Sequence, residues 1–197
     1  MSATIDKKEK TRKNIIDAAI KVLTNKAYNE CLIDMIAKTA GIGKGTVYLY
    51  FKSKQELYYS ILFELVSEAK KIAETAMKSS NKPCEQVKTL LEKMNQFTDS
   101  HGNAFIMAKA EAGNLKGKIQ FKFTEMYGEL LSMIGKIFEG GVNKKVFKKY
   151  PPVLMGALVM TSMLTVAKYK QMNRPGAHTV TTDMIADIFM NGINFNK

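Results

Sequence analysis

Helical spacing of apolar residues is the feature that most limits how this chain can fold. Near the start of the chain the apolar side chains Ile15, Ala18, Ala19, Val22 and Leu23 follow one another at intervals of three and four. This is the pattern of a helix with one buried stripe, and similar spacing recurs along the whole sequence. No segment alternates apolar and polar residues between turn dipeptides, as a half-buried strand would. The sequence therefore predicts an all-α fold.

Glycine, proline and capping residues indicate where the helices begin and end. Gly41 can take the left-handed conformation that ends a helix, and Gly43 is a weaker N-cap for the next one. Ser53 and Glu56 form the sequence pattern of a capping box, which opens a long helix to about Lys78. We expect helices at about residues 7–24, 33–39, 44–50, 53–78, 83–99, 104–112, 116–140, 152–172 and 182–193.

Length and cysteine usage favour a cytoplasmic protein. A chain of 197 residues can bury a core without disulfides, and Cys31 and Cys84 have no metal-ligand spacing, so we expect no metal site and free thiols in a reducing compartment. The N-terminal residues 1–10 lack the apolar region of a secretory signal. The longest apolar stretch, residues 153–167, is shorter than the roughly 20 residues of a membrane span, so we expect no membrane partner.

The net charge of +12 favours an anionic partner, of which nucleic acid is the commonest for a basic protein. Residues 1–60 contain ten Lys and one Arg against three Asp and three Glu, which gives +5 and leaves +7 for the rest of the chain. The basic character is therefore general, and the charge alone does not locate a binding site.

Residues 33–52 contain the signal for nucleic-acid binding. A short helix, a glycine turn and a second short helix follow one another there, which is the layout of a helix-turn-helix. In the second helix the small residues Gly45 and Thr46 would let the backbone approach base edges. Lysine and tyrosine side chains around them can bind phosphates and sugars, namely Lys44, Tyr48, Tyr50, Lys52 and Lys54.

The order and spacing of residues 11–62 resemble the N-terminal pattern of the TetR family of transcriptional regulators. The matching positions are Thr11, Arg12, Ile15, Ala18, Ala19, Tyr28, Ile36, Ala37, Ala40, Gly41, Lys44, Gly45, Thr46, Tyr48, Tyr50, Phe51, Lys54 and Leu57. The resemblance implies a three-helix DNA-binding domain over residues 1–52 and a helical ligand-binding and dimerisation domain over 53–197. It also implies that Lys44, Gly45, Thr46, Tyr48, Tyr50 and Lys54 contact bases or phosphates.

Three positions depart from this family pattern, and some matches have a purely structural interpretation. Ala27 replaces the usual glycine, Leu32 a capping threonine and Gly43 a common serine, and loss of a cap costs about 1 kcal/mol. We therefore assign no DNA contact to Leu32. Phe51 is expected to belong to the core. Tyr48 and Tyr50 are expected to be exposed.

The later helices supply candidates for a ligand pocket and a dimer interface. Flexible Met and flat aromatic side chains can line a lipophilic pocket, although ordinary core packing is the commoner role for them. The ligand candidates are Met94, Phe97, Phe105, Phe123, Met126, Tyr127 and Met160. The helix over residues 152–167 is apolar nearly all round, and with the last helix it matches the bundle by which the family dimerises. The dimer candidates are Leu154, Ala157, Leu158, Ile185, Ile188 and Phe189, and the small Gly156 would allow close helix approach.

These observations predict a homodimeric DNA-binding regulator. We expect it to be a repressor that a small hydrophobic or amphiphilic ligand releases from a palindromic operator. The alternative is a DNA-binding protein that needs no ligand, which would show weak sequence preference. An enzyme is not expected, because the sequence contains no nucleophile elbow, P-loop, dinucleotide glycine motif or metal spacing, and no cofactor other than the effector is implied.

Overall fold

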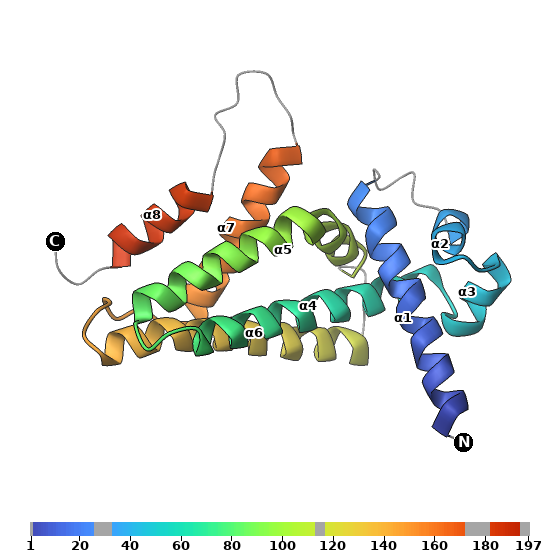
Figure 1. The fold of residues 1–197 in the computed structure, drawn as a ribbon, viewed down its shortest axis with the longest axis horizontal. Coiled ribbons are helices and arrows are strands. Elements are labelled where there is room, and N and C mark those ends of the chain that lie inside the picture. Colours follow the sequence, from blue (N-terminus) through green and yellow to red (C-terminus); the bar gives the residue numbers. More distant parts are fainter. Residues whose placement is uncertain (1, 26–32, 113–116, 172–181, 194–197) are drawn as a thin grey trace. The chain divides into compact units, whose positions relative to one another are not determined.

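The computed structural model describes residues 2–25, 33–112, 117–171 and 182–193, and within these ranges it contains helices and no strand (Figure 1). The all-α prediction is confirmed. The helices are α1 (Ser2–Asn25), α2 (Ile33–Ala40), α3 (Lys44–Tyr50), α4 (Lys54–Lys78), α5 (Pro83–Ala112), α6 (Lys118–Asn143), α7 (Pro152–Gln171) and α8 (Thr182–Ile193). Four positions singled out in the sequence lie outside the described residues, namely Ala27, Tyr28, Cys31 and Leu32.

The chain divides into two compact units. The first comprises Met1–Leu65 and Asn103–Gln120, and the second comprises Val66–Gly102 and Phe121–Lys197. Helices α4, α5 and α6 therefore contribute residues to both units. The functional boundary predicted between residues 52 and 53 stays a prediction.

The apolar stripe of α1 forms much of the core of the first unit. All five of its predicted stripe residues are buried, and α1 packs on α2, which in turn packs on α3. The side-chain amide of Asn14 donates a 2.9 Å hydrogen bond to the carbonyl oxygen of Ala40 at the end of α2. This bond fixes the end of α2 beside α1, where the turn to α3 begins.

Gly41 makes the turn between α2 and α3 in the way the sequence predicts. Its φ is +70°, a left-handed conformation that side chains with a Cβ rarely adopt. The N–H of Gly41 donates to the carbonyl oxygen of Lys38, and that of Ile42 donates to Ala37. These two bonds are those of a Schellman motif, which satisfies the last carbonyl groups of α2 and redirects the chain.

A capping box begins α4. The backbone N–H of Glu56 donates to the hydroxyl of Ser53 at 3.1 Å, as predicted. The carboxylate of Glu56 reaches one residue further back than the standard motif and accepts a 2.7 Å hydrogen bond from the N–H of Lys52. The end of the α3–α4 turn is therefore fixed by two side-chain bonds.

The prediction of two helices between residues 83 and 112 was wrong, because α5 is continuous from Pro83 to Ala112. Gly102 lies in the predicted gap between the two helices, and in the structure it serves helix packing. A Cβ at Gly102 would lie 2.8 Å from the Cβ of Ala167 on α7, closer than real Cβ contacts allow. His101 likewise stacks on Phe97 one helical turn earlier, with ring centroids 5.3 Å apart.

Glycines also let α6 and α7 pack closely in the second unit. An added Cβ at Gly135 would overlap the backbone of Pro152, and one at Gly156 would overlap the carbonyl oxygen of Leu131. The sequence predicted close helix approach at Gly156, and the structure places that approach within the chain, against α6.

By length and composition alone, α7 could cross a membrane over residues 152–169, and it is the one such helix in the described part of the chain. The predicted apolar stretch was shorter because it stopped before Lys168, whereas residues 152–169 include this one charged residue. Met155, Val159, Met160 and Met163 of α7 are buried within the protein, and core helices commonly have this composition. The absence of a membrane partner stays a prediction.

The glycine contact between α6 and α7 predicts a large effect of one methyl group. We expect Gly156→Ala to lower the free energy of unfolding by about 2 kcal/mol, since overpacking a tight contact costs about 1–3 kcal/mol. Gly140→Ala is the matched control, because a Cβ there meets nothing within 4 Å and alanine favours a helix by about 1 kcal/mol. Urea unfolding followed by circular dichroism measures both, and equal stabilities for the two variants would contradict the packing contact.

Candidate nucleic-acid interface

Two buried apolar side chains fix the orientation of α3 in the first unit. Val47 in the middle of the helix and Phe51 just after it are both almost completely buried. The N–H of Phe51 donates to the carbonyl oxygen of Val47 at 3.0 Å, which closes the last turn. The predicted core role of Phe51 is therefore confirmed, and the opposite side of α3 is left for solvent.

Arg12 of α1 contacts the Phe51 ring at the C-terminal end of α3. Its guanidinium lies over the Phe51 ring at 4.9 Å from the ring centroid, and it donates a 2.6 Å hydrogen bond to the hydroxyl of Ser60 on α4. The neighbouring Lys13 pairs with Glu64 of α4 at 3.1 Å. Helices α1 and α4 are thus joined by two polar contacts, one of which also covers the Phe51 ring.

The exposed face of α3 contains two of the predicted DNA contacts, Gly45 and Tyr48. Gly45, Tyr48 and Leu49 are exposed, and their spacing of three and four residues places them on one side of the helix. Lys52 is also exposed, but it follows the end of α3. Tyr48 is 48% exposed, as predicted, and Leu49 is 81% exposed. Thr46 is half-buried at the edge of this face. Tyr50 is half-buried too, although the sequence predicted it to be exposed, because it stands at the edge between this face and the buried side of α3.

Leu49 is the residue of this face that the sequence analysis missed. Its spacing from Gly45 and Tyr48 was a usable signal, but an apolar side chain in a short helix is normally assigned to the core. Only the burial of Val47 on the other side of α3 fixes which apolar residue faces outward.

The lysine side chains beside α3 differ in the groups that they contact. The ammonium of Lys44 lies 3.0 Å from the carboxylate of Asp34 on α2, and this hydrogen bond raises the pKa of Lys44. Lys54, at the start of α4, has its ammonium 5.4 Å from the centroid of the Tyr58 ring. Lys52 is exposed in the turn between α3 and α4. The cationic side chains therefore surround the exposed face on its α2 and α4 sides.

The predicted ligand residues belong to both compact units. Phe105 is buried in the first unit, whereas Met94, Phe97 and Met160 are buried in the second. The remaining three, Phe123, Met126 and Tyr127, are half-buried on α6.

Two aromatic contacts in the second unit involve residues that were predicted to line a ligand pocket. Phe123 and Tyr127 stack with centroids 5.7 Å apart, and burial raises the pKa of the Tyr127 phenol. His101, which stacks on Phe97, has its Nδ1 buried without a hydrogen-bond partner in the part of the chain that the structure describes. The pocket itself stays a prediction.

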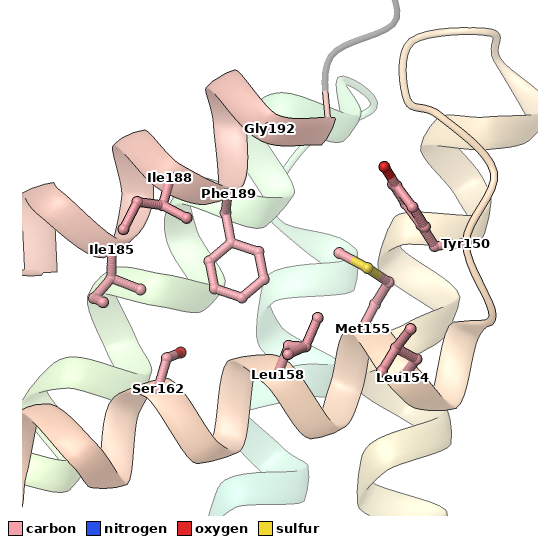
Figure 2. A pocket seen from close by; sticks show the side chains of 9 residues that line it. All are labelled: Tyr150, Leu154, Met155, Leu158, Ser162, Ile185, Ile188, Phe189 and Gly192. Atoms are coloured by element: carbon pink, nitrogen blue, oxygen red, sulfur yellow. The ribbon is translucent and has the colours of Figure 1, made fainter.

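A groove of about 410 Å³ lies between α7 and α8, and the predicted dimer residues line it (Figure 2). Leu154, Leu158 and Ile188 are 45%, 47% and 66% exposed, although all three are large apolar side chains. Phe189 points toward α7 and is buried, with its ring 6.1 Å from that of Phe138. Five of the six predicted residues line the groove, and the sixth, Ala157, is half-buried on α7.

Four further residues complete the lining of the groove, namely Tyr150, Met155, Ser162 and Gly192. Tyr150 precedes α7, so helical periodicity could not have placed it there. Among the described residues no group of three His, Cys, Asp or Glu side chains could hold a metal ion.

Comparison with known proteins identifies the family. A model of bacterial regulatory proteins of the tetR family matches residues 15–61. The HTH-type transcriptional regulator YhgD of Bacillus subtilis strain 168 is 31% identical over 151 residues, which is 76% of this chain and 78% of the relative. The chain belongs to the TetR family. It is therefore a DNA-binding transcriptional regulator, and the prediction that it is no enzyme is confirmed by this membership.

Other TetR-family proteins match over most of the chain. The fatty acid metabolism regulator protein of Bacillus subtilis is 26% identical over 135 residues, or 68% of this chain and 70% of that protein. The transcriptional regulator FadR of the same species, solved in complex with stearoyl-CoA, superposes with a TM-score of 0.71 at 22% identity, over 92% of this chain and 99% of FadR. FadR from Bacillus halodurans gives a TM-score of 0.71 at 21% identity, over 91% and 98%.

Arg12 provides a test of how α3 is positioned. We expect Arg12→Ala to lower the free energy of unfolding by about 1 kcal/mol, the sum of a part-exposed cation–π contact and one hydrogen bond. The matched control is Lys10→Ala, an exposed residue of the same helix, for which a change within about 0.5 kcal/mol is expected. Urea unfolding measures both, and an unchanged midpoint for Arg12→Ala would show that the Phe51 contact adds nothing to stability.

Proposed function

We propose that this TetR-family regulator is a homodimeric repressor that binds a palindromic operator through α3 and leaves it when a hydrophobic or amphiphilic ligand binds. The observation that carries the proposal is the exposed face of α3, which is positioned by the buried Val47 and Phe51. A helix fixed on one side and open on the other can enter the major groove of B-form DNA without rearranging its own core.

Some residues on and beside α3 would bind phosphates, and others would contact bases. Lys44, Lys52 and Lys54 lie around α3 and would neutralise phosphates, with Tyr50 donating its hydroxyl to the backbone. Gly45 has open space where a side chain would stand, so the backbone of α3 can approach base edges closely there. Thr46 and Tyr48 would contact those edges.

A second copy of the chain is the proposed occupant of the α7–α8 groove. Leu154, Leu158 and Ile188 would lose their exposed apolar area in such a dimer, and this burial drives association. Ile185 and Phe189 extend the same apolar surface along α8, and Ala157 is small enough for close approach. A two-fold dimer would place its two α3 helices about 34 Å apart, one turn of DNA, which is the reason to expect a palindrome.

A long-chain fatty acyl thioester is the ligand that we propose first. Two similar proteins are named for fatty acid regulation, and one was solved with stearoyl-CoA. A net charge of +12 suits the anionic CoA moiety, and buried apolar residues such as Met94, Phe97 and Met160 suit the acyl chain. The unpartnered Nδ1 of His101 offers a polar group in the same unit.

Coupling between ligand and operator would run through α4, which contributes residues to both compact units. Movement of α4 in a dimer would change the spacing of the two α3 helices. A coupling of about 1–3 kcal/mol would weaken operator binding by one to two orders of magnitude.

Selection of bound sequences from random duplex DNA at near-physiological salt tests the DNA-binding part of the proposal. We expect an enriched palindrome with half-sites one turn apart, and loss of the enrichment for Tyr48→Ala at an unchanged melting temperature. Tyr48 is exposed and has no role in the core, so its removal leaves folding intact. Binding without enrichment would favour a protein that binds DNA without sequence preference and would overturn the operator model.

The phosphate role of Lys52 predicts a change in salt dependence. Each phosphate neutralised contributes about 0.9 to the slope of log K against log salt, so Lys52→Ala in a dimer should reduce that slope by about 1.8. The matched control is Lys71→Ala, an exposed lysine of α4 that lies outside the proposed interface. Titration of a fluorescent operator at several salt concentrations measures the slopes, and equal slopes for both variants would remove Lys52 from the interface.

The ligand proposal predicts a dependence on acyl-chain length. Stearoyl-CoA at saturating concentration should weaken operator binding by about 10- to 100-fold, whereas CoA alone should have little effect, because the acyl chain supplies the apolar area buried on binding. Operator binding with acyl-CoA esters of increasing length measures this. If all esters leave the affinity unchanged at fixed salt, another effector must be sought, while the DNA-binding proposal remains.

A further inference from the structure

Helix α3 has only one of the side chains that usually read bases by paired hydrogen bonds. Its sequence from Lys44 to Tyr50 is KGTVYLY, which contains no Arg, Asn, Gln, Asp or Glu. Arg or Lys pairs with guanine, Asn or Gln with adenine, and a carboxylate with cytosine, so within α3 only the Lys44 ammonium could make such a contact. The ammonium of Lys44 is already paired with Asp34 at 3.0 Å.

The most exposed large apolar side chain among the described residues belongs to this helix. Leu49 is 81% exposed, and it lies between Tyr48 and the half-buried Tyr50 on the face opposite Val47. It stands one helical turn after Gly45, where the backbone can approach a surface closely. Leu49 is therefore the apolar group that α3 presents to whatever it binds.

We infer that Leu49 reads a thymine through the C5-methyl group in each half-site, and this inference rests on the DNA-binding function proposed for α3. The thymine methyl is the one apolar group on the major-groove edges of the four bases. Contact with Leu49 would remove apolar surface of both partners from water, which is favourable without any hydrogen bond. A cytosine at the same position has no C5-methyl group, so the apolar contact with Leu49 would be lost.

Replacement of thymine by deoxyuridine tests this contact without changing the protein. Deoxyuridine keeps the base pairing of thymine and lacks only the methyl group. With the full-length protein and its selected operator, each thymine is replaced in turn in both half-sites. We expect one symmetric pair of positions at which the wild-type protein binds about fourfold more weakly per methyl group removed.

Two variants assign that methyl contact to Leu49. Leu49→Ala should bind the thymine operator more weakly and lose the difference between thymine and deoxyuridine, whereas Leu49→Met should keep it. The slope of log K against log salt should stay the same in both variants, because no phosphate contact is removed. Melting temperatures check folding, and the wild-type scan stands whether or not a variant folds.

The possible failures can be told apart. Specific operator binding without a deoxyuridine effect, or with an effect that persists in Leu49→Ala, overturns the role of Leu49 and leaves the proposed function intact. A persistent effect would assign the methyl group to another side chain, such as Thr46. Absence of any sequence-specific binding overturns both the inference and the operator model on which it rests.

Discussion

Burial of Val47 and Phe51 is the constraint on which the functional surface depends. Seven residues are too few for a helix to be stable alone, so α3 keeps its shape because one side of it is part of the first unit's core. The Schellman turn at Gly41 sets where α3 begins, and the capping box at Ser53 fixes the chain after it. The orientation of the exposed face of α3 is therefore set by the core behind it.

Charge and apolar surface have separate roles in this protein. Lysines spread over the whole chain give a general attraction to anions, which has long range and falls with salt. Exposed apolar side chains gather in two places, Leu49 on α3 and the α7–α8 groove, and these are the surfaces that we propose for base reading and for dimerisation. Both places expose large apolar groups to water, and a partner that covers them would remove this apolar surface from water, which is favourable.

The sequence predicted most of the helices because their boundaries are local. Residues 33–40 and 44–50 were predicted within one residue, since the Gly41 turn and the following N-cap are short-range features. The predicted break between residues 99 and 104 was wrong because a glycine such as Gly102 is found both in turns and in close helix contacts. Ala167, 65 residues away in sequence, decides between them, and no local pattern contains that information.

The sequence by itself determined the helical class, the helix-turn-helix and the family, because periodicity, caps and glycine turns act over a few residues. Tertiary structure decided which side of each helix is buried. It alone placed Leu49 outside and Val47 inside, assigned Gly156 to a contact with α6, and left Leu154, Leu158 and Ile188 exposed along one groove. The physical reason is that burial depends on which neighbours a helix packs against, and those neighbours are distant in sequence.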